Sequence, residues 1–137
     1  MGFFRRRIHK SVLDESIVEV TEVDGIRQLH LGSKTVQSGM LVSSPLALVF
    51  NYSRAIMYFL LFSEQIKSVL TVGLGGGSVT KYIHAYCPDL QQVVVEINPQ
   101  VIQVARSHFF LDENDERLNV IEADGVVYMA EHPLSHD

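Results

Sequence analysis

The feature that most constrains the fold is a short apolar strand, predicted over Ser68–Val72, that runs into a glycine-rich turn. The turn, Gly73–Gly77, reads Gly-Leu-Gly-Gly-Gly, and the segment Ser78–Tyr86 after it is predicted to be a helix. A second apolar strand, predicted over 92–97, carries Glu96 near its end, 19 residues after the last glycine of the turn. This order of elements is typical of α/β domains that bind a nucleotide.

Strands and helices continue to alternate along the rest of the chain. We predict helices over 99–108 and 125–131, with a strand over 118–122 between them. The unbroken run Val93–Val95 is typical of a strand covered on both faces, and Asn98 is placed to cap the helix that follows it. Such alternation predicts parallel βαβ units, so the predicted fold class is α/β with a Rossmann-like parallel sheet.

The N-terminal part shows a different pattern. Partial alternation over 17–23, the turn signal Asp24-Gly25 and a return strand over 26–31 predict a hairpin. A third short strand is expected over 34–37. We therefore predict a small antiparallel β-meander ahead of the α/β part.

A helix is expected to join the two parts. Ser44-Pro45 supplies an N-cap and a first-turn proline, and the helix should run to about residue 62. This places residues 1–43 in a tail and β-meander, and residues 44–137 in a helix plus nucleoside-binding domain. The apolar stretch is only 17 residues long and carries Arg54, so we expect a buried helix, no membrane partner and a cytoplasmic protein.

Composition excludes several classes of partner. The net charge of −5 argues against nucleic acid, whose binding usually needs an excess of Lys and Arg. The basic cluster at the N-terminus, Arg5–Arg7 with Lys10, is interpreted as a solvated tail. One cysteine, Cys87, excludes an internal disulfide, and the histidines lack metal-ligand spacing, so we expect no metal.

The glycines of the turn have separate predicted roles. Gly73 allows a sharp turn off the strand, whereas Gly75 and Gly77 remove side chains where a ligand would approach the backbone. The helix behind them offers free N–H groups and a positive dipole end. Ser78 breaks the Gly-x-Gly-x-x-Gly dinucleotide pattern, which makes a nicotinamide-dependent dehydrogenase the least favoured function. A tight turn without a ligand is the alternative interpretation.

Two acids are predicted at the carboxyl edge of the sheet, where open α/β folds bind ligands. Glu96 could accept hydrogen bonds from two ribose hydroxyls, or it could be a solvated strand end. Asp124, followed by Gly125, could accept from an adenine amino group, or it could cap the next helix.

These segments together resemble the spermidine synthase family of polyamine aminopropyltransferases, which share the fold of class I S-adenosylmethionine-dependent methyltransferases. The resemblance extends over nearly the whole chain and rests on residues 69–78, 95–102 and 122–125. Its three predicted parallel strands are about the N-terminal half of such a sheet, so we expect the chain to be truncated.

The resemblance also implies a role for each site residue. Glu96 would hold the ribose, Asp124 with Gly125 the adenine, and Gly73–Gly77 the sulfonium side of the ligand. Gln37, in Thr-Val-Gln-Ser, is similar to a glutamine that reaches over the nucleoside from the β-meander.

The chain departs from the family pattern at two places. Gly76 stands where the family has an aspartate that holds the aminopropyl amine, a bond of about 1.5–3 kcal/mol. The apolar segment 46–49 stands where the family has a Tyr-His-Glu-Met type segment. The family's catalytic aspartate follows a fourth strand, beyond residue 137, so this fragment alone is expected to be inactive.

The leading hypothesis is therefore aminopropyl transfer from decarboxylated S-adenosylmethionine to a small-molecule amine, by an enzyme expected to be a homodimer. One alternative is a methyltransferase that uses S-adenosylmethionine itself, which Gly76 favours slightly. Another is a non-catalytic nucleoside-binding or assembly module.

Overall fold

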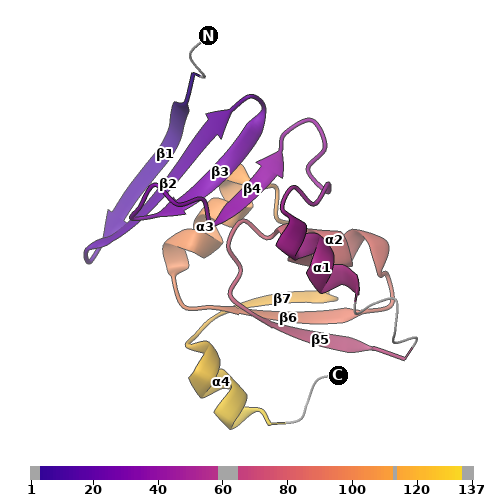
Figure 1. Cartoon of the computed structure of the whole chain (residues 1–137). Coiled ribbons are helices and arrows are strands. Elements are labelled where there is room, and N and C mark those ends of the chain that lie inside the picture. Colours follow the sequence, from indigo (N-terminus) through magenta and orange to yellow (C-terminus); the bar gives the residue numbers. More distant parts are fainter. Residues whose placement is uncertain (1–3, 59–64, 113, 134–137) are drawn as a thin grey trace.

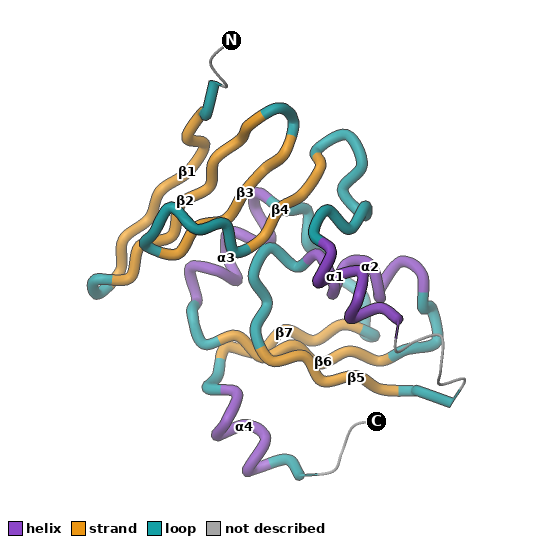
Figure 2. Tube along the Cα trace, in the orientation of Figure 1, coloured by secondary structure: helices purple, strands orange, loops and turns teal. Residues whose placement is uncertain are grey.

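Two sheets, one antiparallel and one parallel, organise the fold (Figures 1 and 2). The computed structural model describes residues 4–58, 65–112 and 114–133. The antiparallel sheet has the order β1-β2-β3-β4 and the parallel sheet the order β5-β6-β7. The strands are β1 (Arg6–Leu13), β2 (Ser16–Val23), β3 (Ile26–Leu31), β4 (Ser38–Leu41), β5 (Ser68–Val72), β6 (Gln91–Glu96) and β7 (Leu118–Glu122). The helices are α1 (Asn51–Met57), α2 (Ser78–Tyr86), α3 (Pro99–His108) and α4 (Gly125–Glu131).

The basic cluster is exposed to solvent as predicted, but it is not a tail, because residues 6–13 form strand β1. This strand pairs with β2 from Arg6↔Glu22 to Leu13↔Ser16. The turn between them is Asp14-Glu15, and both residues have positive φ (47° and 68°). Such turns usually contain glycine, and because this one has none, the sequence did not predict it. The hairpin predicted at Asp24-Gly25 is confirmed, with φ values of 50° and 77°.

The third strand expected over 34–37 was also misplaced. Residues 32–37 form a loop, in which the Ser33 hydroxyl accepts a hydrogen bond from the Thr35 amide, and strand β4 begins only at Ser38. Local serine-to-backbone bonding competes with strand pairing here. The antiparallel sheet therefore has four strands where the sequence predicted three.

The predicted helix start at Ser44 was wrong as well. Ser44-Pro45 instead begins a turn, closed by a hydrogen bond from the Ala47 amide to the Ser44 carbonyl. Helix α1 starts at Asn51, after an extended Phe50 that makes no side-chain cap. The end expected near residue 62 lies outside the described residues.

The parallel sheet follows the prediction closely. Strands β5 and β7 and helices α2, α3 and α4 have the predicted bounds, and β6 begins and ends one residue earlier than expected. Central strand β6 is covered on both faces, with Val94 and Val95 buried. The Asn98 side chain caps α3 by accepting from the Gln100 amide at 2.9 Å.

The two sheets share one core, which α3 builds between them. Helices α2 and α3 lie on the side of the parallel sheet that faces the antiparallel sheet, and α4 lies on the opposite side (Figure 1). The largest buried cluster takes residues from both sheets and from α3: Val18, Val20, Leu29, Met40, Val94, Val101, Ile102, Val104, Ala105 and Phe109, among others. The predicted boundary after residue 43 falls between β4 and α1 and stays a prediction. Within the described ranges, no helix is long and apolar enough to span a bilayer.

Candidate nucleoside-binding site

A cavity of about 630 Å³ lies along β5 and the glycine turn that follows it. This volume is within the range of about 300–1,000 Å³ typical of small-molecule sites. Its walls come from β5, from the turn, from α1 and α2, and from the segment between β3 and β4. Among the lining residues are Gln37, Ser38, Tyr52, Thr71, Gly73, Leu74, Gly75, Ser78 and Glu96.

The glycine turn takes a backbone path that requires glycine. Gly73, Gly75 and Gly77 have φ values of 92°, 56° and 72°, in the region that other residues adopt only with strain. A Cβ at Gly73 would meet nothing within 4 Å, so the backbone is open to an approaching ligand there. The predicted turn off the strand is thus present, and the Gly73 amide still donates to Val95 of β6.

Gly76 lies behind the turn rather than in the cavity. It is buried, and its amide donates to the Ser38 hydroxyl at 2.9 Å. A Cβ at this position would come within 3.0 Å of both the Phe109 ring and the Ser38 side chain. A side chain at position 76 would therefore require small shifts of Phe109, which follows α3, and of Ser38 in β4. Gly77 is also buried, against Leu74 and Leu111.

The Glu96 carboxylate holds the turn in place. One oxygen accepts from the Leu74 amide and the other from the Asn98 amide, both at 2.9 Å. This structural role was not predicted from the sequence. A carboxylate has about four lone-pair sites, so two remain for ligand hydroxyls. Among the described residues that line the cavity, Glu96 alone carries a charge.

Gln37 borders the cavity, and its reach over a nucleoside stays a prediction. Its carbonyl accepts from the Tyr52 hydroxyl at 3.1 Å, which ties α1 to the loop before β4. Sequence reasoning missed Ser38 and Tyr52. Ser38 directly follows Gln37 in the sequence, which was a signal that it could lie at the same cavity. No sequence signal indicated Tyr52.

Asp124 and Gly125 lie beside the cavity and not among its lining residues. One Asp124 oxygen accepts from the Val126 and Val127 amides at 2.8 and 3.2 Å, so the side chain caps α4. Gly125 is in tight contact with β5, since a Cβ there would overlap the Val72 side chain. Val72 lines the cavity, so Asp124 and Gly125 are separated from the cavity by this one side chain.

Together these groups suit a hydroxyl-bearing ligand with a polar end. Helix α2 begins at Gly77 without a side-chain cap, so its first amides and its positive dipole end are available near the turn. Glu96 supplies hydrogen-bond acceptors at the opposite side of the turn. In the part of the chain that the structure describes, no group of three or more His, Cys, Asp or Glu residues could hold a metal ion.

This fold and cavity define a Rossmann-like α/β protein of the methyltransferase type. The crystal structure of spermidine synthase from Thermotoga maritima matches 92% of this chain and 44% of its own, with a TM-score of 0.74 at 18% identity. Human Methyltransferase-like protein 13 in complex with SAH matches 64% of this chain and 43% of its own, with a TM-score of 0.56 at 29% identity. Both confirm the predicted fold class.

Sequence comparison narrows the class to a family. Residues 49–137 match the spermine/spermidine synthase domain, and the chain belongs to this family. The polyamine aminopropyltransferase of Chromobacterium violaceum is 48% identical over 126 residues, which are 92% of this chain and 48% of that protein. The chain thus spans about half the length of the curated relatives it matches. The resemblance inferred from residues 69–78, 95–102 and 122–125 is confirmed.

Proposed function

We propose that the protein takes part in aminopropyl transfer from decarboxylated S-adenosylmethionine to a small-molecule amine. The observation that carries this proposal is the 48% identity to a polyamine aminopropyltransferase across 92% of the chain. In this reaction the amine nitrogen attacks the methylene next to the sulfonium, the carbon–sulfur bond breaks, and methylthioadenosine leaves. The attacking nitrogen loses a proton, so the enzyme must position two partners and accept that proton.

The residues of this chain would hold the nucleoside. The free lone pairs of Glu96 would accept from the ribose hydroxyls, and Gln37 would border the base or sugar from the loop before β4. Asp124 has a second carboxylate oxygen beyond the one that caps α4, and this oxygen would accept from the adenine amino group. We assign no catalytic base within residues 1–137, since the resemblance places that aspartate after a further strand.

Methyl transfer from S-adenosylmethionine itself is a second candidate, and Gly76 is the observation that favours it. The aminopropyl ammonium would find no carboxylate at position 76, because Gly76 has no side chain. S-adenosylmethionine carries its own carboxylate, which the free amides at the start of α2 could bind. Human Methyltransferase-like protein 13, with SAH bound, has the same fold.

Calorimetric titration of the complete gene product separates these functions. We expect decarboxylated S-adenosylmethionine and methylthioadenosine to bind more tightly than S-adenosylmethionine. A preference for the carboxylated form would replace aminopropyl transfer with methyl transfer. Absence of binding by all three ligands would leave a non-catalytic assembly module as the better interpretation.

Two further properties are proposed from the family resemblance. We propose that the complete protein is a cytoplasmic homodimer. Analytical ultracentrifugation at micromolar concentration would show a dimer mass, and a monomer would contradict the proposal.

A further inference from the structure

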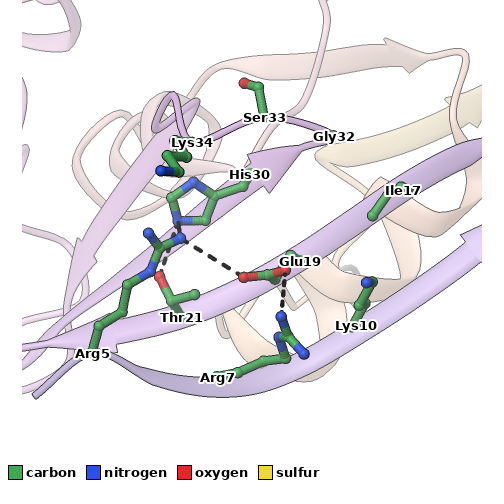
Figure 3. A pocket seen from close by; sticks show the side chains of 10 residues that line it. All are labelled: Arg5, Arg7, Lys10, Ile17, Glu19, Thr21, His30, Gly32, Ser33 and Lys34. Atoms are coloured by element: carbon green, nitrogen blue, oxygen red, sulfur yellow. Dashed lines mark hydrogen bonds and ion pairs between the residues drawn. The ribbon is translucent and has the colours of Figure 1, made fainter.

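A second cavity, of about 480 Å³, lies on the face of the antiparallel sheet that points away from the shared core (Figure 3). It is separate from the nucleoside-binding cavity, with which it shares no lining residue. Four basic side chains line it, from Arg5, Arg7, Lys10 and Lys34, together with the single acid Glu19. The cavity therefore carries three more positive than negative charges.

A β-bulge gathers the basic residues on one face. Arg7 pairs with Thr21 and Lys10 pairs with Glu19, although Arg7 and Lys10 are three residues apart and would face opposite sides of a regular strand. The register shift between Arg7 and His9 adds one residue to β1, so that Arg7 and Lys10 lie on the same face. Ile8 packs against the core. Bulges of this kind re-aim side chains.

The cations of the cavity are only partly neutralised. Glu19 lies 3.7 Å from the Arg5 guanidinium and 3.4 Å from that of Arg7. These distances exceed the roughly 2.7–2.9 Å of charge-assisted hydrogen bonds, so donors on both arginines remain available. Within the described residues, the ammonium groups of Lys10 and Lys34 have no hydrogen-bond or ion-pair partner.

His30 fixes Arg5 at the floor of the cavity. The imidazole is buried, its Nδ1 lies 3.1 Å from the Thr35 carbonyl, and its Nε2 lies 3.2 Å from the Arg5 guanidinium. A carbonyl can only accept and a guanidinium can only donate, so the network assigns the proton to Nδ1 and leaves Nε2 as acceptor. The ring thus orients Arg5 without adding a positive charge, and Thr21 makes a second contact with Nε2 at 2.9 Å.

We propose that this cavity binds a small anion that carries two or three phosphate groups. Three excess positive charges match such a group, and guanidinium donors suit phosphate oxygens. The volume exceeds what a single phosphate needs. The net charge of the chain, −5, disfavours an extended nucleic acid, whose affinity comes from many phosphate contacts.

Calorimetry with the full chain at 0.15 M salt tests the proposal. We expect saturable 1:1 binding of pyrophosphate and tripolyphosphate, each tighter than inorganic phosphate. Arg7→Gln and Lys10→Gln should each weaken tripolyphosphate about tenfold. Lys67→Gln, which removes an exposed lysine outside the cavity, should leave the affinity unchanged.

Glu19→Gln distinguishes a binding site from a cluster that only holds β1 in place. Removal of the competing acid should strengthen tripolyphosphate binding, by roughly threefold. A purely structural cluster would lose thermal stability in this variant and show no phosphate-dependent shift in melting temperature, which would overturn the proposal. An equal loss of affinity in Lys67→Gln would overturn it too.

Two more titrations identify the source of the anion. Equal affinities for ATP and tripolyphosphate, both about tenfold weaker in Lys10→Gln, support recognition of the phosphates in this cavity. Unchanged affinities for both ATP and tripolyphosphate in Lys10→Gln would place the phosphates elsewhere and overturn the proposal. Tighter binding of a single-stranded oligonucleotide than of tripolyphosphate would assign the face to nucleic acid, with the same consequence.

Discussion

The Glu96 carboxylate holds the glycine turn and is also proposed to hold the ribose, which makes its substitution informative. In Glu96→Gln, the side-chain NH₂ would face the backbone N–H of either Leu74 or Asn98. Both groups are donors, so one of the two hydrogen bonds would be lost. We expect the free energy of unfolding, measured by urea denaturation without ligand, to fall by about 1–3 kcal/mol. Glu122→Gln is the matched control, because Glu122 pairs with Glu96 in register and is exposed. Equal losses in the two variants would contradict the assigned role.

The same residue should also determine ligand affinity. Glu96→Ala is expected to weaken nucleoside binding by roughly 1–3 kcal/mol, because hydrogen bonds to an ionised group are lost. Calorimetry with methylthioadenosine measures this. An unchanged affinity would mean that the ribose binds elsewhere.

Lys81 predicts a pH dependence of stability. Its ammonium is buried against the Phe109 carbonyl at 2.7 Å and the Met40 sulfur, and burial lowers its pKa from 10.5 to about 8. The unfolded chain therefore binds more protons than the folded chain between about pH 8 and 10.5, so this lysine makes stability rise with pH across that window. Urea denaturation at pH 7 to 10 should show a shallower rise, or a steeper fall, for Lys81→Met than for the wild type. Parallel curves would contradict the prediction.

At the scale of elements, α4 depends on Asp124 for its start. Asp124→Ala removes the cap from the Val126 and Val127 amides and should cost about 1 kcal/mol, seen as faster hydrogen exchange at these amides. Asp124→Asn keeps a side-chain acceptor and should preserve the cap. If Asp124 also binds adenine, the asparagine variant should lose nucleoside affinity while α4 stays protected. Unchanged exchange in Asp124→Ala would contradict the capping role.

Elements with strong local signals were mostly predicted correctly, but one strand without a marked turn was missed and one apparent helix start was wrong. Asn98-Pro99 caps α3 as expected, because the cap is made within the segment. Strand β1 was missed because its turn, Asp14-Glu15, has no glycine and its pairing is with β2. Ser44-Pro45 has the composition of a helix start, yet a local turn formed there instead.

The candidate site, like the fold, was predicted in part. Gln37, Gly73, Gly75 and Glu96 do lie around one cavity, because the carboxyl edge of a parallel sheet collects such residues. The tight packing around Gly76 comes from Ser38 and Phe109, 38 and 33 residues away, and no local pattern encodes it.

At the scale of the whole molecule, the two sheets should unfold together. Arg27 of β3 donates to the His108 carbonyl at 2.8 Å, and Asn98 donates to the Ser16 hydroxyl at 3.0 Å, in addition to the shared core. We expect hydrogen exchange of β2 and β6 amides to follow one unfolding transition in urea. Earlier loss of protection in β2 would show that the antiparallel sheet is a separate unit.

The position of α3 between the sheets also has a consequence for the order of synthesis. The apolar face of the antiparallel sheet, with Val18, Leu29 and Met40, is covered by residues of α3 that leave the ribosome about 60 residues after Met40. Until Pro99–His108 is made, the apolar side of this four-stranded sheet lacks its α3 partner, and isolated small sheets are marginal in water. The nascent chain therefore carries an incompletely covered apolar surface while about 60 residues are added, and α3 is the element that closes it.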